Sequence, residues 1–337
     1  MLQRSGSAAG PGRRTVLATL AGLPLVGGCV APILKGLGWR SHEEDRLAGR
    51  TSAVTSATIK AFDFSSLKDL KGQIPHARIG RVELSRLILG GNLIGGWAHA
   101  RDLIYVSSLV KAYHTRQKVY ETFMLAEKCG VNTFLTNPAL CGIINDYWRQ
   151  RVGRIQFISD CAAGDLMTGI KQSIDGGACA CYIQGGIGDE MVRRKQFDQI
   201  ANALEFIRKN GQPAGMGAHK LATVQGCVAQ GIKPDFWMKT LHHNRYWSAQ
   251  IQQECDNTWC ENAEATIAFM KDLPEPWIAY KILAAGAIQP ADGFRYALQH
   301  GADFLCVGMY DFQMVEDANI ALEALAEHQK RERPWRA

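Results

Sequence analysis

The chain has 337 residues, of which 47% are hydrophobic and 21% charged, so it is long enough to form one large domain with a substantial core. Its net charge of +6 is modest, and its Lys and Arg residues are scattered along the sequence. No basic stripe interleaved with aromatic residues is present, which argues against a nucleic-acid partner.

The first 29 residues predict an export signal. Arg13 and Arg14 precede an uncharged run of apolar and small residues from Thr15 to Gly28, which is too short for a stable membrane-spanning helix. The segment resembles a twin-arginine signal, and its end, Val26-Gly27-Gly28-Cys29, resembles a lipoprotein cleavage box with Cys29 as the acylated residue. This resemblance implies the twin-arginine export machinery as a partner and a lipid-anchored protein on the periplasmic or cell-envelope side. The alternative is a disordered tail with a chance Arg-Arg pair.

Composition divides the rest of the chain into three parts. Residues 30–73 predict a linker, because stretches such as 41–45 and 51–53 are polar and prone to turns. Residues 74–330 predict the folded domain, and residues 331–337 predict a short charged tail.

Short apolar strands alternate with amphipathic helices after residue 74, and this alternation is typical of a parallel sheet with helical crossovers. A hairpin is expected at His76–Ile79 and Val82–Leu84. Eight strands follow, at Leu87–Gly90, Val131–Leu135, Ile155–Ser159, Ala178–Ile183, Ala214–Ala218, Asp235–Thr240, Trp277–Leu283 and Phe304–Val307. Helices are expected at about Gln117–Lys128, Gly142–Arg151, Asp189–Lys209, from after Cys260 to Lys271, and Val315–Gln329. Eight such units predict a (β/α)8 barrel.

Five of the predicted strands end on a polar residue that alternation places toward the barrel interior. These residues are Asp160, Gln184, His219, Lys239 and Lys281. In the sixth strand this register puts Trp237 inward with Lys239 and puts Phe236 and Met238 toward the helices; in the seventh it puts Trp277 and Ala279 inward with Lys281. Catalytic groups of barrel enzymes lie at these strand ends. We therefore predict that Asp160, His219, Lys239 and Lys281 are catalytic, although each alone could cap a helix or pair with a neighbour.

The residues from Ile79 to Gly91, Gly130 to Thr136, Gly215 to His219 and Val307 to Tyr310 resemble, in order and spacing, the hairpin and strands of the aldo/keto reductase superfamily. That family uses Asp, Tyr, Lys and His, with the Tyr protonating the carbonyl during hydride transfer. The four corresponding positions here hold Leu135, Leu140, Asp160 and Gln184, so none of these roles carries over. Leucine cannot donate a proton. In the segment after the eighth strand, Asp311 disfavours the 2′-phosphate of NADPH.

The remaining polar residues leave several chemistries open. Either lysine could act as a Schiff-base nucleophile, or both could bind a carboxylate or stabilise an enolate. His219, His242, His243, Asp160 and His99 could hold a divalent metal, and NAD(P) remains a candidate cofactor. Aromatic residues in the loops, such as Trp97 and Trp259, suit a sugar ring. The residues predicted to bind substrate are Asn92, His99, Gln184, His242, Tyr246 and Trp247.

The sequence therefore predicts an exported barrel enzyme that acts on a small carbonyl compound, such as a sugar derivative, by proton transfer. The alternatives are an NAD(P)-dependent oxidoreductase with a different acid and a non-catalytic solute-binding lipoprotein.

Overall fold

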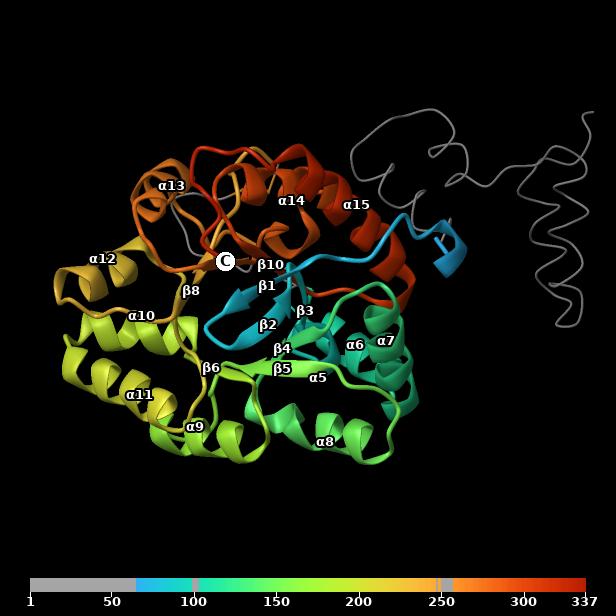
Figure 1. The fold of residues 1–337 in the computed structure, drawn as a ribbon, viewed down its shortest axis with the longest axis horizontal. Helices are drawn as coiled ribbons and strands as arrows, with labels where there is room; N and C mark the ends of the chain where they lie inside the picture. The colour runs from blue at the N-terminus through green and yellow to red at the C-terminus, as the bar shows by residue number, and fades with distance from the viewer. Residues whose placement is uncertain (1–64, 99–102, 247, 250–256) are drawn as a thin grey trace, which may run out of the picture. The chain divides into compact units, whose positions relative to one another are not determined.

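The computed structural model describes residues 65–98, 103–246, 248–249 and 257–337 (Figure 1). The predicted signal with Cys29 lies outside these residues, as do His99 and Trp247. None of the helices within the described ranges is long and apolar enough to cross a membrane.

Eight parallel strands close into a barrel in the order β10-β3-β4-β5-β6-β7-β8-β9, and β1 pairs with β2 in a separate antiparallel hairpin. The hairpin strands are β1 (His76–Ile79) and β2 (Val82–Ser85). The barrel strands are β3 (Leu87–Gly90), β4 (Thr133–Thr136), β5 (Gln156–Ser159), β6 (Ala180–Ile183), β7 (Ala214–Ala218), β8 (Phe236–Thr240), β9 (Trp277–Tyr280) and β10 (Phe304–Val307). The predicted (β/α)8 barrel with an N-terminal hairpin is confirmed.

Helices surround the barrel (Figure 1). They are α5 (Asn92–Gly95), α6 (Val106–Tyr113), α7 (Arg116–Lys128), α8 (Cys141–Arg149), α9 (Leu166–Asp175), α10 (Gly185–Arg193), α11 (Phe197–Lys209), α12 (Leu221–Ala229), α13 (Ala263–Lys271), α14 (Pro290–Gln299) and α15 (Met314–Glu327). Short 3-10 turns occur at Leu67–Asp69, Pro138–Leu140, Ala284–Gly286 and Asp311–Gln313. The single helix predicted over Asp189–Lys209 is wrong: Lys195 adopts a left-handed conformation with φ 57° and separates α10 from α11.

The two faces of the barrel strands carry separate hydrophobic cores. The inner core joins the hairpin to inward side chains of the strands, and consists of Ile79, Val82, Leu84, Ile88, Ile158, Ala180, Tyr182, Phe236, Met238, Ile278, Phe304 and Cys306. The outer core lies between strands and helices and contains Trp237, Trp277 and Ala279. The inward and outward positions predicted for the sixth and seventh strands are therefore wrong.

A buried ionic cluster closes the end of the barrel where the strands begin. Asp303 lies just before β10 and forms ion pairs with two arginines. Its Oδ1 lies 2.8 Å from Arg331 Nη2, and its Oδ2 lies 2.7 Å from Arg333 Nη1; all three side chains are at most 1% exposed. Its oxygens also accept the backbone N–H groups of Trp277 and Arg336. Residues 331–337, predicted as a tail, therefore pack on the barrel, and Figure 1 shows the C-terminus beside the hairpin.

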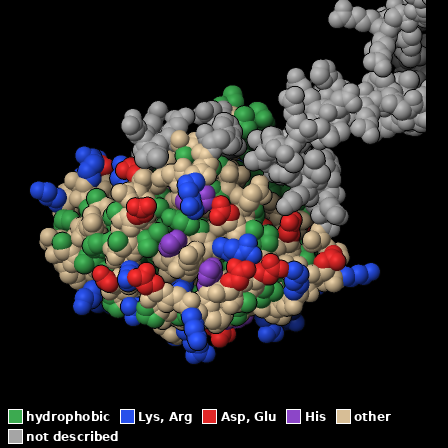
Figure 2. Space-filling view, turned by 90° about the horizontal axis from the view of Figure 1, so that it is seen from above, with side chains coloured by type: hydrophobic (Ala, Val, Ile, Leu, Met, Phe, Trp, Pro, Cys, Tyr) green, Lys and Arg blue, Asp and Glu red, His purple; other side chains and the backbone are tan. Residues whose placement is uncertain are grey.

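Acidic and basic side chains are interspersed on the face of the molecule in Figure 2, with no extended area of one sign. This distribution matches the scattered Lys and Arg of the sequence.

Replacing Asp303 should strongly destabilise the barrel. In Asp303→Asn, the two buried guanidinium groups lose their carboxylate, and removing one partner of such a pair costs ~3–5 kcal/mol. Chemical denaturation should report this loss. Asp175→Asn, an exposed change at the end of α9, is the matched control and should stay within ~0.5 kcal/mol of wild type. An Asp303→Asn protein as stable as the control would contradict the structural role of the cluster.

Candidate active site

A pocket of about 580 Å³ opens at the end of the barrel where the strands finish. Strand ends and the loops that follow them line it. Its polar lining residues are Asn92, Thr136, Asn137, Asp160, Tyr182, Gln184, His219, Tyr280, Lys281, Tyr310 and Gln313, and Trp97 and Trp259 also line it. Ligand pockets of barrel enzymes occur at this end.

Asp160 follows β5 directly and contributes a carboxyl group to the pocket. Burial raises its pKa to about 6, although a hydrogen bond from the backbone N–H of Ala162 at 2.9 Å opposes the shift. No ion pair joins Asp160 to another side chain in the described part of the chain. A carboxyl group with this pKa can exchange protons near neutral pH.

His219 follows β7 and is held from behind by Asp189 of α10. Its Nδ1 lies 3.0 Å from Asp189 Oδ2, and the hydroxyl of Thr223 donates to Asp189 Oδ1 at 2.6 Å. Burial opposes the charge on Asp189, but the hydrogen bonds from His219 and Thr223 keep its pKa below the ordinary value. An ionised Asp189 accepts the Nδ1 proton, which leaves the lone pair on Nε2.

Burial also lowers the pKa of His219, and the positive charge of Lys281 adds to this effect against the opposing influence of Asp189. The imidazole is therefore neutral at pH 7. A neutral imidazole with an oriented Nε2 lone pair can accept a proton. The sequence did not point to Asp189, which lies on a helix 30 positions before His219.

Lys281 lines the same pocket, with its Nζ 3.9 Å from the centre of the Trp259 ring. The alternation of side chains along β9 does not explain why Lys281 reaches the pocket. Strand β9 ends at Tyr280, and Lys281 then adopts a left-handed conformation with φ 57°. The prediction that Lys281 lies at the pocket was correct in place, but its assumed inward register with Ala279 was wrong.

Lys239 does not line the pocket, which corrects the prediction. On β8, Phe236 and Met238 occupy the barrel interior, so the alternate residues Trp237 and Lys239 face outward. The Lys239 ammonium is 1% exposed and donates to His219 O at 2.7 Å, Thr240 O at 3.0 Å and Thr240 Oγ1 at 2.7 Å. Burial lowers its pKa. Lys239 thus stabilises the backbone that carries His219 and has no contact with the pocket.

The loop histidines also have structural contacts in place of the predicted ligand contacts. His242 is fully buried, and its Nε2 accepts the backbone N–H groups of Trp259 and Cys260. Burial lowers its pKa to about 4. His243 Nε2 lies 2.9 Å from Asp292 of α14, and the hydroxyl of Tyr246 donates to Asn257 O. None of these three residues lines the pocket.

Asn92 and Gln184 were predicted to bind substrate, and the structure places both at the pocket. Both line the pocket; Asn92 is the first residue of α5, and Gln184 precedes α10. The Gln184 side-chain oxygen accepts the backbone N–H of Ile187 at 3.0 Å, so it caps the helix while its side chain borders the pocket.

Two hydroxyl groups that the sequence analysis did not single out have no hydrogen-bond partner in the described chain. They are Tyr280 Oη, on the last residue of β9, and Thr136 Oγ1, on the last residue of β4. Both residues line the pocket. Burial raises the pKa of Tyr280 well above its ordinary value, so this hydroxyl keeps its proton. A buried hydrogen-bond donor without an acceptor is uncommon. Either hydroxyl could therefore donate to an oxygen atom of a bound ligand.

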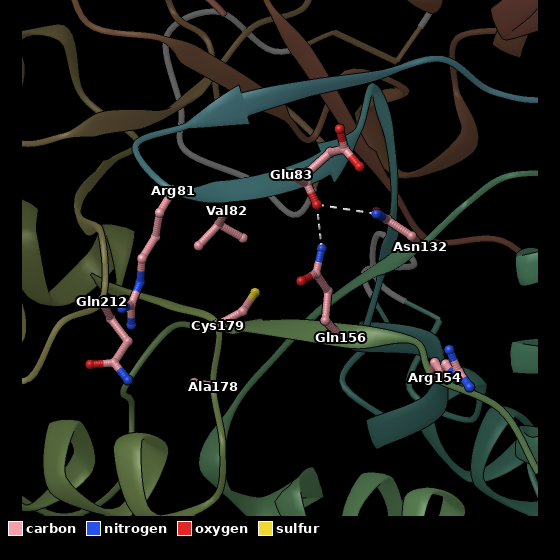
Figure 3. A pocket seen from close by; sticks show the side chains of 9 residues that line it. All are labelled: Arg81, Val82, Glu83, Asn132, Arg154, Gln156, Ala178, Cys179 and Gln212. Atoms are coloured by element: carbon pink, nitrogen blue, oxygen red, sulfur yellow. Dashed lines mark hydrogen bonds between the residues drawn. The ribbon is translucent and has the colours of Figure 1, made fainter. Parts of the chain in front are cut away.

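A second hollow, of about 780 Å³, lies at the opposite end of the barrel beside the hairpin. Figure 3 shows that the side chains of Gln156 and Asn132 both donate to the backbone oxygen of Glu83 there. Its charged side chains, Arg81, Glu83 and Arg154, are exposed. Although this hollow is larger, burial raises the pKa of its Cys179 thiol to about 12, so the thiol stays protonated near neutral pH. Residues at this end of barrels mainly support stability.

The described lining does not fit NADPH. Lys281 is the single Lys or Arg among the described lining residues, whereas phosphate groups are usually held by several donors of this kind. Asp311, near the pocket mouth, is held by Tyr113 and Lys118. Within the described residues, no group of three or more His, Cys, Asp or Glu side chains could hold a metal ion.

No protein-family model and no curated protein matches the chain. Two solved structures of Pseudomonas aeruginosa proteins, each described as a "putative aldo-keto reductase", are similar to it. One has a TM-score of 0.55 at 15% identity and covers 78% of this chain and 100% of its own. The other has a TM-score of 0.54 at 15% identity and covers 76% and 99%. The chain has a (β/α)8 barrel similar to the barrels of these two structures. At this identity, the likeness concerns the fold alone.

Asp160→Asn should change how stability depends on pH. The folded-state pKa of about 6 lies above the ordinary value of 3.8, so wild-type stability should fall as pH rises from about 4 to about 6. The variant lacks this titration and should gain up to ~3 kcal/mol relative to wild type above pH 6, with no gain below pH 4. Denaturation of both proteins across pH 4–8 measures the difference, and Asp175→Asn is the control. A difference that stays constant with pH would contradict the assignment.

Proposed function

We propose that the protein is an enzyme that moves protons next to the carbonyl group of a small polyhydroxylated compound, such as a sugar derivative. The reaction would be an isomerisation, elimination or aldol-type cleavage. One observation carries this proposal: Asp160, with a pKa of about 6, lines the same pocket as His219, which burial keeps neutral and Asp189 orients through Nδ1. Groups with such different environments are suited to separate acid and base roles.

In this mechanism, Asp160 removes the proton from the carbon beside the carbonyl group. Electron density moves to the carbonyl oxygen, where the Lys281 ammonium stabilises the developing negative charge. In an isomerisation, the Nε2 lone pair of His219 accepts the proton of the neighbouring substrate hydroxyl and gives it to the enolate oxygen. The protonated Asp160 then returns its proton to the former carbonyl carbon, so both groups regain their starting states. A Schiff-base variant of the mechanism would use Lys281 as the nucleophile.

The aromatic side chains of the pocket support a compound with a ring or a carbon chain. Trp97 and Trp259 both line the pocket, and a tryptophan face can pack against the C–H groups of a sugar. Asn92 and Gln184 add amide groups that can hydrogen-bond hydroxyls in the same pocket.

Proton exchange tests the proposal directly. Dihydroxyacetone and D-xylulose, incubated with the protein in deuterated water, should incorporate deuterium beside the carbonyl group, which proton NMR measures. Asp160→Asn should lower the rate by ~10²–10⁴-fold, because it removes the base. Lys281→Met should lower it by ~10²–10³-fold, because it removes the charge that stabilises the oxyanion.

Asp175→Asn and Lys171→Met, two exposed changes on α9, are the matched controls and should keep the wild-type rate. Wild-type protein that exchanges neither compound, or an Asp160→Asn protein that exchanges at the control rate, would refute the proposal. Borohydride reduction with D-xylulose separates the two roles of Lys281, because only a Schiff base leaves a covalent adduct.

Two alternatives give different results in simple experiments. An NAD(P)-dependent oxidoreductase would change the fluorescence of NADH or NADPH on binding. A solute-binding lipoprotein would bind sugars in calorimetry without exchange of their protons.

The proposal includes export and lipid attachment at Cys29, which the order of Arg13-Arg14, the apolar run and Cys29 supports. In cells fed labelled palmitate, the wild-type chain should be labelled and should sediment with membranes. Cys29→Ser should lose the label because the thiol that accepts the lipid is gone. Cys227→Ser, which changes a buried cysteine of α12, is the control. Labelling of Cys29→Ser at the wild-type level would contradict attachment at this residue.

A further inference from the structure

The pocket differs in polarity between its floor and its mouth. The polar groups Asp160, His219 and Tyr280 come from strand ends at the floor. Apolar residues of the two segments that follow β3 and β9 also line the pocket: Leu93, Trp97, Leu103 and Val106 in the first, and Leu283 and Ala285 in the second. A ligand that fills the whole pocket must therefore contact both kinds of surface.

Two of the mouth residues present large apolar areas to solvent. Trp97 is 40% exposed and Leu103 is 50% exposed. Apolar residues that are exposed together around a pocket, in contrast to single ones elsewhere, mark a surface that a binding partner covers.

The position of Trp97 is set by its neighbours. A Cβ atom at Gly95 would lie 2.2 Å from the Trp97 ring, so the ring lies directly against the glycine. The left-handed conformation of Gly96, with φ 73°, turns the chain between them. Contact with the glycine limits the orientations of the indole, and a side chain restricted in this way loses less entropy on binding.

We infer that the substrate is amphipathic: a carbonyl-bearing polar head binds at the floor, and an apolar substituent contacts Trp97 and Leu103 on one segment and Leu283 and Ala285 on the other. This inference rests on the proposed function for the chemistry of the head and adds the chemical class of the rest of the substrate. Burying an alkyl substituent there removes apolar surface of ligand and protein from water together.

A series of 1-hydroxy-2-alkanones tests the inference, because the head stays constant while the chain grows from hydroxyacetone to 1-hydroxy-2-octanone. Calorimetry should show affinity rising by up to about fourfold for each added methylene, the value for full burial of this group. The deuterium-exchange kcat/KM should rise in parallel. Leu103→Ser should flatten this dependence on chain length, since it removes one side of the apolar wall.

Leu109→Ser is the matched control. Leu109 lies on α6, is 59% exposed and does not line the pocket, so the change should leave the chain-length dependence intact. An affinity that does not vary with chain length in the wild type would overturn the inference. Equal flattening by Leu109→Ser would also overturn it, because the alkyl chain would then adsorb to the outer apolar surface.

Failure of the proposed function gives a different result. In that case no member of the series exchanges deuterium with the wild type, while calorimetry still reports whether affinity grows with chain length. Growth in affinity without exchange would keep the amphipathic ligand and reject the chemistry.

Discussion

The packing of large side chains against glycines of β7 determines which polar residues reach the pocket. Gly215 faces the barrel interior, and a Cβ atom there would lie 2.3 Å from the ring of Phe236. The space that the glycine leaves is filled by Phe236 on the neighbouring strand, so Met238 also points inward and Lys239 points outward. One close contact thus removes a lysine from the pocket and leaves His219 at the end of β7 to face it.

The outward lysine still affects the site through the backbone. Its ammonium donates to the carbonyl oxygen of His219, and the Thr240 hydroxyl donates to the same oxygen. On the other side, the Asp189 carboxylate accepts hydrogen bonds from the backbone N–H and the ring Nδ1–H of His219. His219 is therefore held at its backbone and its ring, as a group whose lone pair must point in one direction requires.

A strained turn after β9 places the Lys281 side chain at the pocket. Lys281, Ala284 and Ala285 all have positive φ, between 46° and 57°, which is unfavourable for residues with a Cβ atom. Such residues persist where the surroundings hold them, and they are concentrated at functional sites. Here the strained turn aims Lys281 at the pocket and forms part of its apolar mouth.

The barrel, its hairpin and the location of Asp160, Gln184 and His219 at the strand ends could be predicted from the sequence. These features follow from the local alternation of apolar and polar residues. Lys239 could not be placed in this way, since its direction depends on contacts between β7 and β8. Pairings distant in sequence were also missed. Asp189 acts on His219 from a helix, and Arg331 and Arg333 read as an exposed cluster until Asp303 is brought beside them.

The polar floor and the apolar mouth are electrostatically linked. Burial is the main reason that the pKa of Asp160 is raised. An apolar substituent in the mouth would exclude further water from the carboxylate, and its pKa would rise again because the charged form loses more solvation. The same desolvation strengthens the attraction between Lys281 and a developing oxyanion, because that interaction then acts through a medium of lower dielectric constant. A ligand that fills the mouth therefore makes the base stronger and the oxyanion more stable together, so recognition of the apolar part contributes to the chemical step.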